Sequence, residues 1–318
     1  MSVRAGSPEA VARGPGGPVQ GARRNGRVRE TLGRILRQRN AQLGLAILGL
    51  FACLAVFAPV LAPFEPNADL LSLEPGVKSL APPCIHALGC PADQWQHLMG
   101  TDSNFRDVLS RVIWGARISL VVGFVTVGLA IVVGSALGAI AGFAGGRTDA
   151  LIMRAMDILL VFPSLILAIA IVTVLGRGLL NALLAIGIVA IPVYARIMRA
   201  SVITVREQDF VTASRALGES PGGILVRRIL PNALTPILVA GTLGIGGAIL
   251  DVAALSFIGL GADPRTPEWG AMIGLERNRV FAAPHLLIFP GIAISLTVLA
   301  FNLFGDGLRD ALDPRLER

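Results

Sequence analysis

Residues 209–232 read DFVTASRALGESPGGILVRRILPN, a polar, arginine-bearing segment that lies between two long apolar stretches. Its first part is predicted to form a short helix. Asp209 is placed to cap that helix, because its carboxylate can accept a backbone N–H of the first turn. Phe210, Ala213 and Leu217 recur at helical spacing and so fall on one face. We therefore expect a short amphipathic helix that does not cross a membrane.

The second part of this segment begins with a break in the chain. Gly218 fits the left-handed residue that ends many helices, because glycine adopts positive φ without steric cost. Ser220 followed by Pro221 is typical of a second helix start, with a serine cap and proline in the first turn. The segment is therefore predicted to be a short helix, a sharp break and a second helix that leads into the next apolar stretch.

The composition places the chain among membrane proteins. Its 318 residues are 53% hydrophobic and only 15% charged, with a mean hydropathy of +0.69, whereas a soluble domain carries about 25% charged residues. The net charge of +7 and the pI near 10.7 would suit a nucleic-acid-binding protein. The basic residues, however, sit in one tail and in the loops, where membrane topology explains them, so no nucleic-acid partner is expected.

Six apolar stretches are long enough to cross a bilayer, which takes about 20 residues per helix. They cover residues 43–61, 118–143, 158–176, 179–195, 229–250 and 286–305. Only Arg177 and Gly178 separate the third stretch from the fourth, which predicts a tight hairpin. The predicted fold class is an all-α polytopic membrane protein with six transmembrane helices.

Arginine counts predict the orientation of these helices. Residues 1–40 carry nine arginines against two glutamates, and the 196–228 loop carries six arginines. The 62–117 loop instead carries six acidic residues against four basic ones. Both termini and the 209–232 segment are therefore predicted to be cytoplasmic, and the 62–117 loop is predicted to be extracytoplasmic.

The end of that extracytoplasmic loop, residues 107–114, has an amphipathic pattern. Apolar residues fall on one side of this segment and arginines on the other. Trp114 suits the interface between membrane and water. We expect a separate interfacial helix before the second span.

These patterns divide the chain into five parts. They are a largely disordered cytoplasmic tail (1–40), the first transmembrane helix (41–62), an extracytoplasmic loop with an interfacial helix (63–117), a core of five transmembrane helices with the cytoplasmic loop 207–231 (118–306), and a cytoplasmic C-terminal tail (307–318).

The chain carries no sign of an enzyme. Lys78 is its only lysine, and the sequence around it cannot supply the Gly-x-x-x-x-Gly-Lys-Ser/Thr loop that binds the phosphates of ATP. Any ATP hydrolysis must therefore belong to other subunits. No cofactor or metal is expected in this chain.

The 209–232 segment resembles the Glu-Ala-Ala coupling loop of ATP-binding-cassette importer permeases. Thr212, Ala213 and Ser214 stand where Glu-Ala-Ala is usual, so the glutamate is missing. Gly218 and the Ile-Leu-Pro-Asn of residues 229–232 match the pattern. The helix–glycine–helix arrangement of the family is therefore kept.

A second stretch, residues 99–120, places the chain within one branch of this family. It reads MGTDSNFRDVLSRVIWGARISL and is similar to the Gly-Thr-Asp-x-x-Gly-Arg-Asp-Val-Leu-Ser-Arg segment of the dipeptide, oligopeptide and nickel permeases. Residues 253–261 and 302–315 match that branch too. Phe105 replaces the usual glycine, so we expect the local turn to differ.

The resemblance implies a transporter subunit in a bacterial inner membrane. Two such permeases enclose a path for peptides or a related solute such as nickel, two ATPase subunits bind ATP and Mg²⁺ and dock on the coupling helices, and an extracytoplasmic binding protein delivers the substrate. The coupling contacts then fall on Asp209, Phe210, Thr212, Ala213, Ser214, Arg215, Leu217, Gly218 and Glu219. Arg215 is expected to pair with acidic residues of the ATPase. The alternative is a passive channel or scaffold with six spans.

Two polar residues within the apolar stretches are candidates for the path or its gate. Asp251 lies near the outer end of the fifth stretch, where a carboxylate is costly and usually functional. It either meets a peptide amine or a metal in the cavity, or pairs with Arg265 or Arg117 to hold an outer gate; both interpretations stay open. Asn302 in the sixth stretch suits hydrogen bonding between helices more than substrate binding.

The extracytoplasmic loop contains a cysteine pair, Cys84 and Cys90. Disulfides persist outside the membrane, and the glycine and prolines around this pair allow the chain to turn back. We predict a disulfide. The spacing also permits a metal site built from the two cysteines with His86 and His97, although these ligands follow no recognised pattern.

Overall fold

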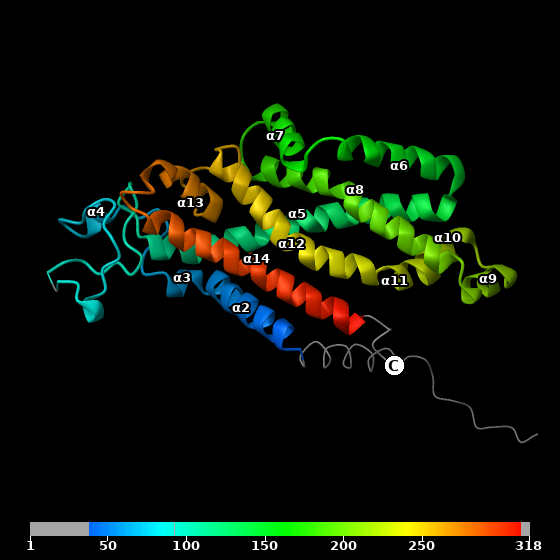
Figure 1. Ribbon diagram of the computed structural model, residues 1–318, viewed down its shortest axis with the longest axis horizontal. Coiled ribbons are helices and arrows are strands. Elements are labelled where there is room, and N and C mark those ends of the chain that lie inside the picture. Colours follow the sequence, from blue (N-terminus) through cyan, green and yellow to red (C-terminus); the bar gives the residue numbers. More distant parts are fainter. Residues whose placement is uncertain (1–37, 92, 313–318) are drawn as a thin grey trace, which may run out of the picture.

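The computed structural model describes residues 38–91 and 93–312, and within these ranges the chain is helical with no β-strand. Five helices are long and apolar enough to cross a membrane. They are α2 (Arg39–Val56), α5 (Val108–Ala144), α8 (Leu179–Arg206), α12 (Thr235–Phe257) and α14 (His285–Leu312). Figure 1 shows them running side by side along the long axis of the molecule. The chain is therefore an all-α polytopic membrane protein.

The third predicted span, residues 158–176, is not one straight helix. It straddles the break between α6 (Gly146–Leu160) and α7 (Ser164–Leu175), whose axes differ by 91°. Pro163 stands immediately before α7, where it cannot continue a helical hydrogen-bond ladder. With 12 residues, α7 is only about 18 Å long. A sixth crossing therefore exists only if the bent pair counts as one span.

The prediction of a separate interfacial helix at residues 107–114 is wrong. These residues form the first turns of α5, which continues without a break to Ala144. Asp107 caps the helix by accepting the backbone N–H of Ser110. Arg111 is 1% exposed, because it points into the protein rather than to an interface.

The observed ends of the other long helices also differ from the predicted ends of the spans. The fourth prediction ended too early, because α8 continues to Arg206, and the fifth began too early, because a proline-interrupted segment precedes α12. α14 extends to Leu312, so the predicted C-terminal tail, residues 307–318, starts inside a helix. The N-terminal tail prediction concerns residues 1–40, nearly all of which lie outside the described residues.

Small residues allow the long helices to pack closely. Gly134, Gly138 and Gly142 of α5 face α8 at intervals of one turn. A Cβ atom on Gly134 would lie 2.7 Å from a backbone oxygen of α8, and one on Gly142 would lie 2.8 Å from another. Neither position tolerates a side chain, and this spacing of small residues is common where membrane helices touch.

The bundle has two distinct ends (Figure 1). The insertion end consists of residues 57–107, the 176–178 turn and residues 257–285, and it includes α3 (Ala58–Leu61), α4 (Leu70–Leu73) and α13 (Trp269–Glu276). The α9 end consists of residues 207–234. It contains α9 (Asp209–Ala216), α10 (Pro221–Gly223), the π-helix η2 (Ile224–Ile229) and α11 (Leu230–Ala233).

Candidate functional site

The short helix α9 projects at one extreme of the molecule, between α8 and the segment that leads to α12 (Figure 1). It begins at Asp209, but Asp209 does not cap it: the N-cap position is Gln208, and no side chain bonds to the free N–H groups there. Asp209 instead lies in the first turn, where its negative charge is favourable beside the positive end of the helix dipole.

One face of α9 is anchored in the protein. Val211 is fully buried and belongs to the same apolar cluster as Val205, Ile224 and Ile229. Ser214 is 9% exposed on the same side, and its hydroxyl bonds within the helix, to the backbone oxygen of Phe210 over 2.9 Å. The helix is therefore held by a narrow stripe of its surface.

The face beside this stripe is open and partly apolar. Phe210 is 38% exposed and Leu217 is 87% exposed, so the face predicted from the spacing points to the outside. Asp209, Thr212, Ala213 and Arg215 are exposed as well. Arg215 makes no ion pair with any residue of 38–91 or 93–312. This face thus combines apolar surface with an unneutralised guanidinium.

The turn after α9 is built around Gly218, which has φ +78°. Its N–H donates to the oxygen of Arg215, and the N–H of Glu219 donates to the oxygen of Ser214 over 3.1 Å. This pair of bonds closes the helix in the Schellman arrangement, which needs a left-handed residue at this position. A residue with a branched Cβ could not take it without strain.

The predicted second helix is present but interrupted. The Ser220 hydroxyl caps it by accepting the N–H of Gly223, with Pro221 in the first turn. The chain then passes through η2 and α11 before α12 begins, because Pro231 and Pro236 each remove a backbone donor. An ion pair of 3.0 Å joins Glu219 to Arg228 of η2 and ties the turn to this segment.

The two polar candidates in the spans have no partner among the described residues. Asp251 is half-buried on α12 and forms neither a hydrogen bond nor an ion pair with any of them, so the expected pair with Arg265 or Arg117 is absent. One turn earlier, Gly247 has open space where a side chain would lie. Asn302 is exposed on α14 and makes no hydrogen bond between helices within the described chain. Asp251 and Gly247 therefore mark an open, polar face of α12.

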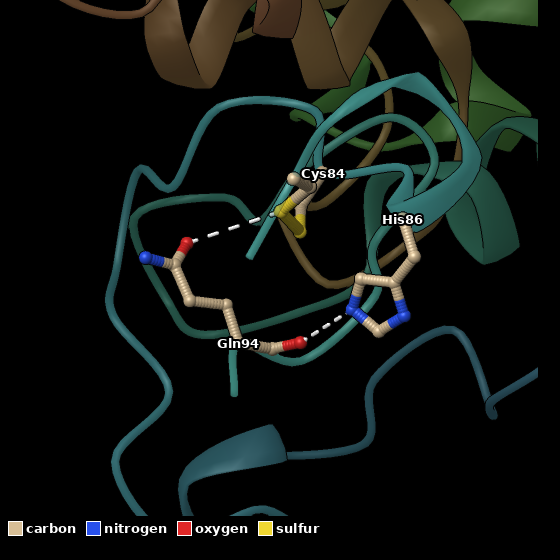
Figure 2. The surroundings of a disulfide bond; sticks show 4 residues. Cys84, His86 and Gln94 are labelled. Atoms are coloured by element: carbon tan, nitrogen blue, oxygen red, sulfur yellow. Dashed lines mark hydrogen bonds between the residues drawn. A yellow bond between two sulfur atoms is a disulfide. The ribbon is translucent and has the colours of Figure 1, made fainter. Parts of the chain in front are cut away.

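At the insertion end, Cys84 and Cys90 are joined by a disulfide (Figure 2). Their Cα atoms lie 5.4 Å apart, within the usual range for such a bond. Gly89 with φ +98° allows the chain to turn back between them. His86 bonds through Nε2 to the backbone oxygen of Gln94 over 2.8 Å.

The alternative to the disulfide, a four-ligand metal site, is not assembled. His97 is buried and turned away: its Nδ1 lies 3.1 Å from Asp107 and its Nε2 lies 3.0 Å from Glu74. Burial alone would lower the pKa of His97, but the hydrogen bonds and charges of Asp107 and Glu74 outweigh it and raise that pKa. Donor atoms of Cys84, His86 and Cys90 do converge within 4.8 Å, but the two sulfurs are bonded to each other.

A buried charge network at the insertion end was missed from the sequence. Asp102 accepts from Nε of Arg106 over 2.7 Å, and Arg111 donates to backbone oxygens of Pro66 and Pro264 over 2.9 and 3.2 Å. The Ser103 hydroxyl donates to Glu276 over 2.6 Å. The one signal of this network in the sequence was the cluster of charged residues just before the second apolar stretch. The network ties the 62–107 loop to the loop before α13 and to α13 itself.

Phe105 lies in a tight turn stabilised by a neighbouring carboxylate. Phe105 adopts φ +55°, the left-handed conformation that glycine favours. Asp102 holds this turn by accepting the N–H groups of Asn104 and Arg106 over 2.8 and 2.9 Å. The surrounding bonds therefore impose on phenylalanine a conformation that costs it energy.

Comparison with known proteins identifies the family. Residues 134–318 match the model of the binding-protein-dependent transport system inner membrane component, and residues 26–83 match the N-terminal transmembrane domain of oligopeptide transport permease C. The chain belongs to this family of membrane permeases. Such permeases are transporter subunits and not enzymes, and the Gly218 turn and open face of α9 stand where the family's coupling loop is expected.

Individual relatives agree with this assignment. A dipeptide transport system permease of Alkalihalophilus pseudofirmus is 44% identical, covering 91% of this chain and 90% of that protein. A di/tripeptide permease of Pseudomonas aeruginosa is 46% identical over 86% and 88%. A glutathione transport permease of Escherichia coli is 42% identical over 89% of each.

A solved structure shares the fold of this permease. The inward-facing MetNI methionine ABC transporter contains a chain that matches with a TM-score of 0.54 at 18% identity, covering 64% of this chain and 98% of that one. At this identity the likeness concerns the fold alone.

Proposed function

We propose that this permease forms one half of the translocation path of an ATP-driven importer for short peptides. It would pair with a second, homologous permease, receive substrate from an extracytoplasmic binding protein, and dock two ATPase subunits that bind ATP and Mg²⁺. The peptide permeases among its relatives support the substrate class. Nickel, carried by the branch named above, is the alternative solute.

The open face of α9 is the observation that carries this proposal. Phe210 and Leu217 expose apolar side chains on a helix that the bundle holds only through Val211 and Ser214. An exposed apolar surface flanked by a free arginine suits a protein partner, and Arg215 can bind a carboxylate of that partner bidentately. A passive channel or scaffold has no need of such a helix.

The α9 end is rich in arginine, and we propose that it lies on the cytoplasmic side of the membrane. The α9 end carries Arg215, Arg227 and Arg228, all exposed, and cytoplasmic loops are enriched in arginine. Both termini would share that side, in a bacterial inner membrane. The ATPase subunits would then meet α9 where ATP is available.

Co-purification with the ATPase subunits tests the proposal. The chain should elute with them as one complex, and added permease should stimulate their ATP hydrolysis in proteoliposomes. The double variant Phe210→Ser with Leu217→Ser should abolish this elution, while Val226→Ser, an exposed apolar position of η2, serves as the matched control. A chain that conducts solute without ATPase subunits would support the passive channel instead.

Asp251 is proposed to face the path. Its carboxylate has no partner within the described residues and the adjacent Gly247 leaves space beside it. We expect Asp251→Asn to slow peptide uptake by about tenfold, equivalent to ~1.4 kcal/mol of lost stabilisation, because a neutral amide cannot balance a peptide amine. Uptake into reconstituted vesicles and complex assembly are measured together. Unchanged uptake would assign this residue a structural role.

A further inference from the structure

A cavity of about 490 Å³ opens at the insertion end, separate from the α9 face and from Asp251. It lies between the turn that joins α7 to α8, the loop that follows α12, and α13. Figure 1 shows these three elements gathered at the same end of the bundle. Its volume falls within the range of sites that hold small molecules, roughly 300–1,000 Å³.

Charges of both signs line this cavity without neutralising one another. Arg177, Arg277 and Asp263 contribute to its wall, and no ion pair joins them. Arg277 uses one N–H to reach the backbone oxygen of Gly274 over 2.9 Å, which leaves its other donors unused. One carboxylate oxygen of Asp263 accepts the backbone N–H of Arg265 over 2.8 Å, and the other has no partner in the part of the chain that the structure describes. The cavity thus offers separate positive and negative groups to a ligand.

The turn that presents Arg177 is firmly held. It is flanked by Gly176 at φ +95° and Gly178 at φ +141°, conformations that other residues rarely adopt. The N–H of Gly178 donates to the oxygen of Leu260 over 3.3 Å, and the Asn181 side chain donates to the oxygen of Gly176 over 3.0 Å. The base of the Arg177 side chain is therefore fixed against the loop that follows α12.

The opposite wall is equally fixed. Gly274 of α13 packs against the end of α12 so closely that a Cβ atom there would lie 2.7 Å from the oxygen of Phe257. Gly259, at φ +83°, has nothing within 4 Å of the position that a side chain would take. The cavity wall is thus rigid at its sides and open at Gly259, where the backbone of a ligand can approach.

We propose that this cavity binds a short peptide with free termini, its carboxylate held by Arg177 and Arg277 and its ammonium group by Asp263. This inference rests on the proposed peptide-import function. Two guanidinium groups suit one carboxylate because each can donate two parallel hydrogen bonds. Asp263 disfavours a phosphate or a lipid headgroup of net negative charge, because like charges repel. The cavity would be an entry subsite that selects zwitterionic peptides at the mouth of the path.

Equilibrium binding to the full chain in lipid nanodiscs, without ATPase subunits, tests the site. The probes are dialanine, dialanine amide and N-acetyl-dialanine. We expect each capped peptide to bind about tenfold more weakly than dialanine, the loss typical of one charged hydrogen-bond partner. Arg177→Gln and Arg277→Gln should weaken dialanine and erase its advantage over the amide. Asp263→Asn should erase its advantage over the acetylated peptide.

Arg265→Gln is the matched control, because Arg265 is an exposed arginine of the same loop that does not line the cavity. It should bind dialanine as the unaltered chain does. The inference is overturned if the amide binds as well as dialanine, if Arg265→Gln loses as much affinity, or if anionic lipid displaces dialanine. ATPase stimulation, measured separately in proteoliposomes, tests the importer itself, so the two failures are distinguishable.

Discussion

The insertion end and the α9 end both contain charged side chains, but they differ in how these side chains are buried and paired. At the insertion end one set of charged side chains, distinct from those that line the cavity, is buried and hydrogen-bonded: Arg111 is 1% exposed, Asp102 4% and Glu276 2%. At the α9 end Arg215 is exposed and unpaired within the described chain, and the ion pair between Glu219 and Arg228 is partly open to solvent.

The difference follows from what each arrangement can do. Buried ion pairs require precise geometry, because charges removed from water must be compensated. Such a network holds loops distant in sequence in one fixed shape, as it does between Ser103 and Glu276. Exposed groups keep their bonding capacity for a partner. The buried network therefore makes a fixed frame of its part of the insertion end, whereas the α9 end keeps the exposed groups that the proposed docking surface requires.

Removing Arg111 tests the fixed frame and carries the largest expected effect. Arg111→Met keeps an unbranched side chain, shorter than arginine, but it removes the donor to the backbone oxygens of Pro66 and Pro264 and the positive charge 3.9 Å from Asp102. We expect the stability to fall by about 3–5 kcal/mol, the usual cost of breaking a buried pair. Tryptophan fluorescence during thermal unfolding in detergent measures it.

Arg117→Met provides the comparison for Arg111, since Arg117 lies on the same helix but is exposed. Its effect should stay within about 0.5 kcal/mol. If both variants unfold alike, the buried network does not stabilise the insertion end.

Replacing Gly218 tests the α9 end. Gly218→Val forces a β-branched residue to φ +78°, which costs roughly 1–2 kcal/mol or more and displaces α9. The complex should still assemble but lose its substrate-stimulated ATP hydrolysis. Gly222→Ala is the matched control, because Gly222 lies in open space without positive φ. Normal peptide transport by the valine variant would remove α9 from the coupling path.

The sequence predicted the all-helical architecture well because the length of an apolar stretch is a local signal. The glycine turn at Gly218 and the cap at Ser220 were likewise predictable, since each depends on neighbours in the chain. The bend between α6 and α7 was not predicted, because residues 158–176 were read by hydropathy, which cannot register a change of direction, although Pro163 is a local signal of the break. Tertiary packing decides where such a stretch turns.

The insertion end was the least predictable region. Arg111 looked like the polar side of an interfacial helix, but its partners lie more than 40 residues away in both directions, at Pro66 and Pro264. His97 looked like a metal ligand, but Glu74 and Asp107 occupy both of its nitrogens. Spacing along the chain cannot reveal contacts of that range.

Reducing the disulfide should affect the stability of the insertion end less than replacing Arg111 does. Closing the short loop between Cys84 and Cys90 should contribute about 2 kcal/mol to the local stability of the insertion end. Intact-mass analysis after alkylation, with and without reductant, should show both thiols blocked only after reduction. The α9 end should keep its ATPase stimulation in the reduced protein. Full alkylation without reductant or chelator would contradict the disulfide.

The titration of His97 is the smallest expected effect and the most specific to the insertion end. Its pKa is raised in the folded protein by Asp107 and Glu74 and returns to about 6.5 on unfolding. Protonation therefore stabilises the fold: the contribution is complete below about pH 6.5 and is lost as the pH rises through the folded pKa. The unfolding midpoint should thus be lower at about pH 8.5 than at about pH 6. His97→Gln, which keeps a hydrogen-bonding side chain but cannot titrate, should flatten this slope, whereas His86→Gln, at an exposed position, should leave it unchanged. A slope that survives in His97→Gln would place the pH-sensitive group elsewhere and leave the buried imidazolium without a role in holding the insertion end.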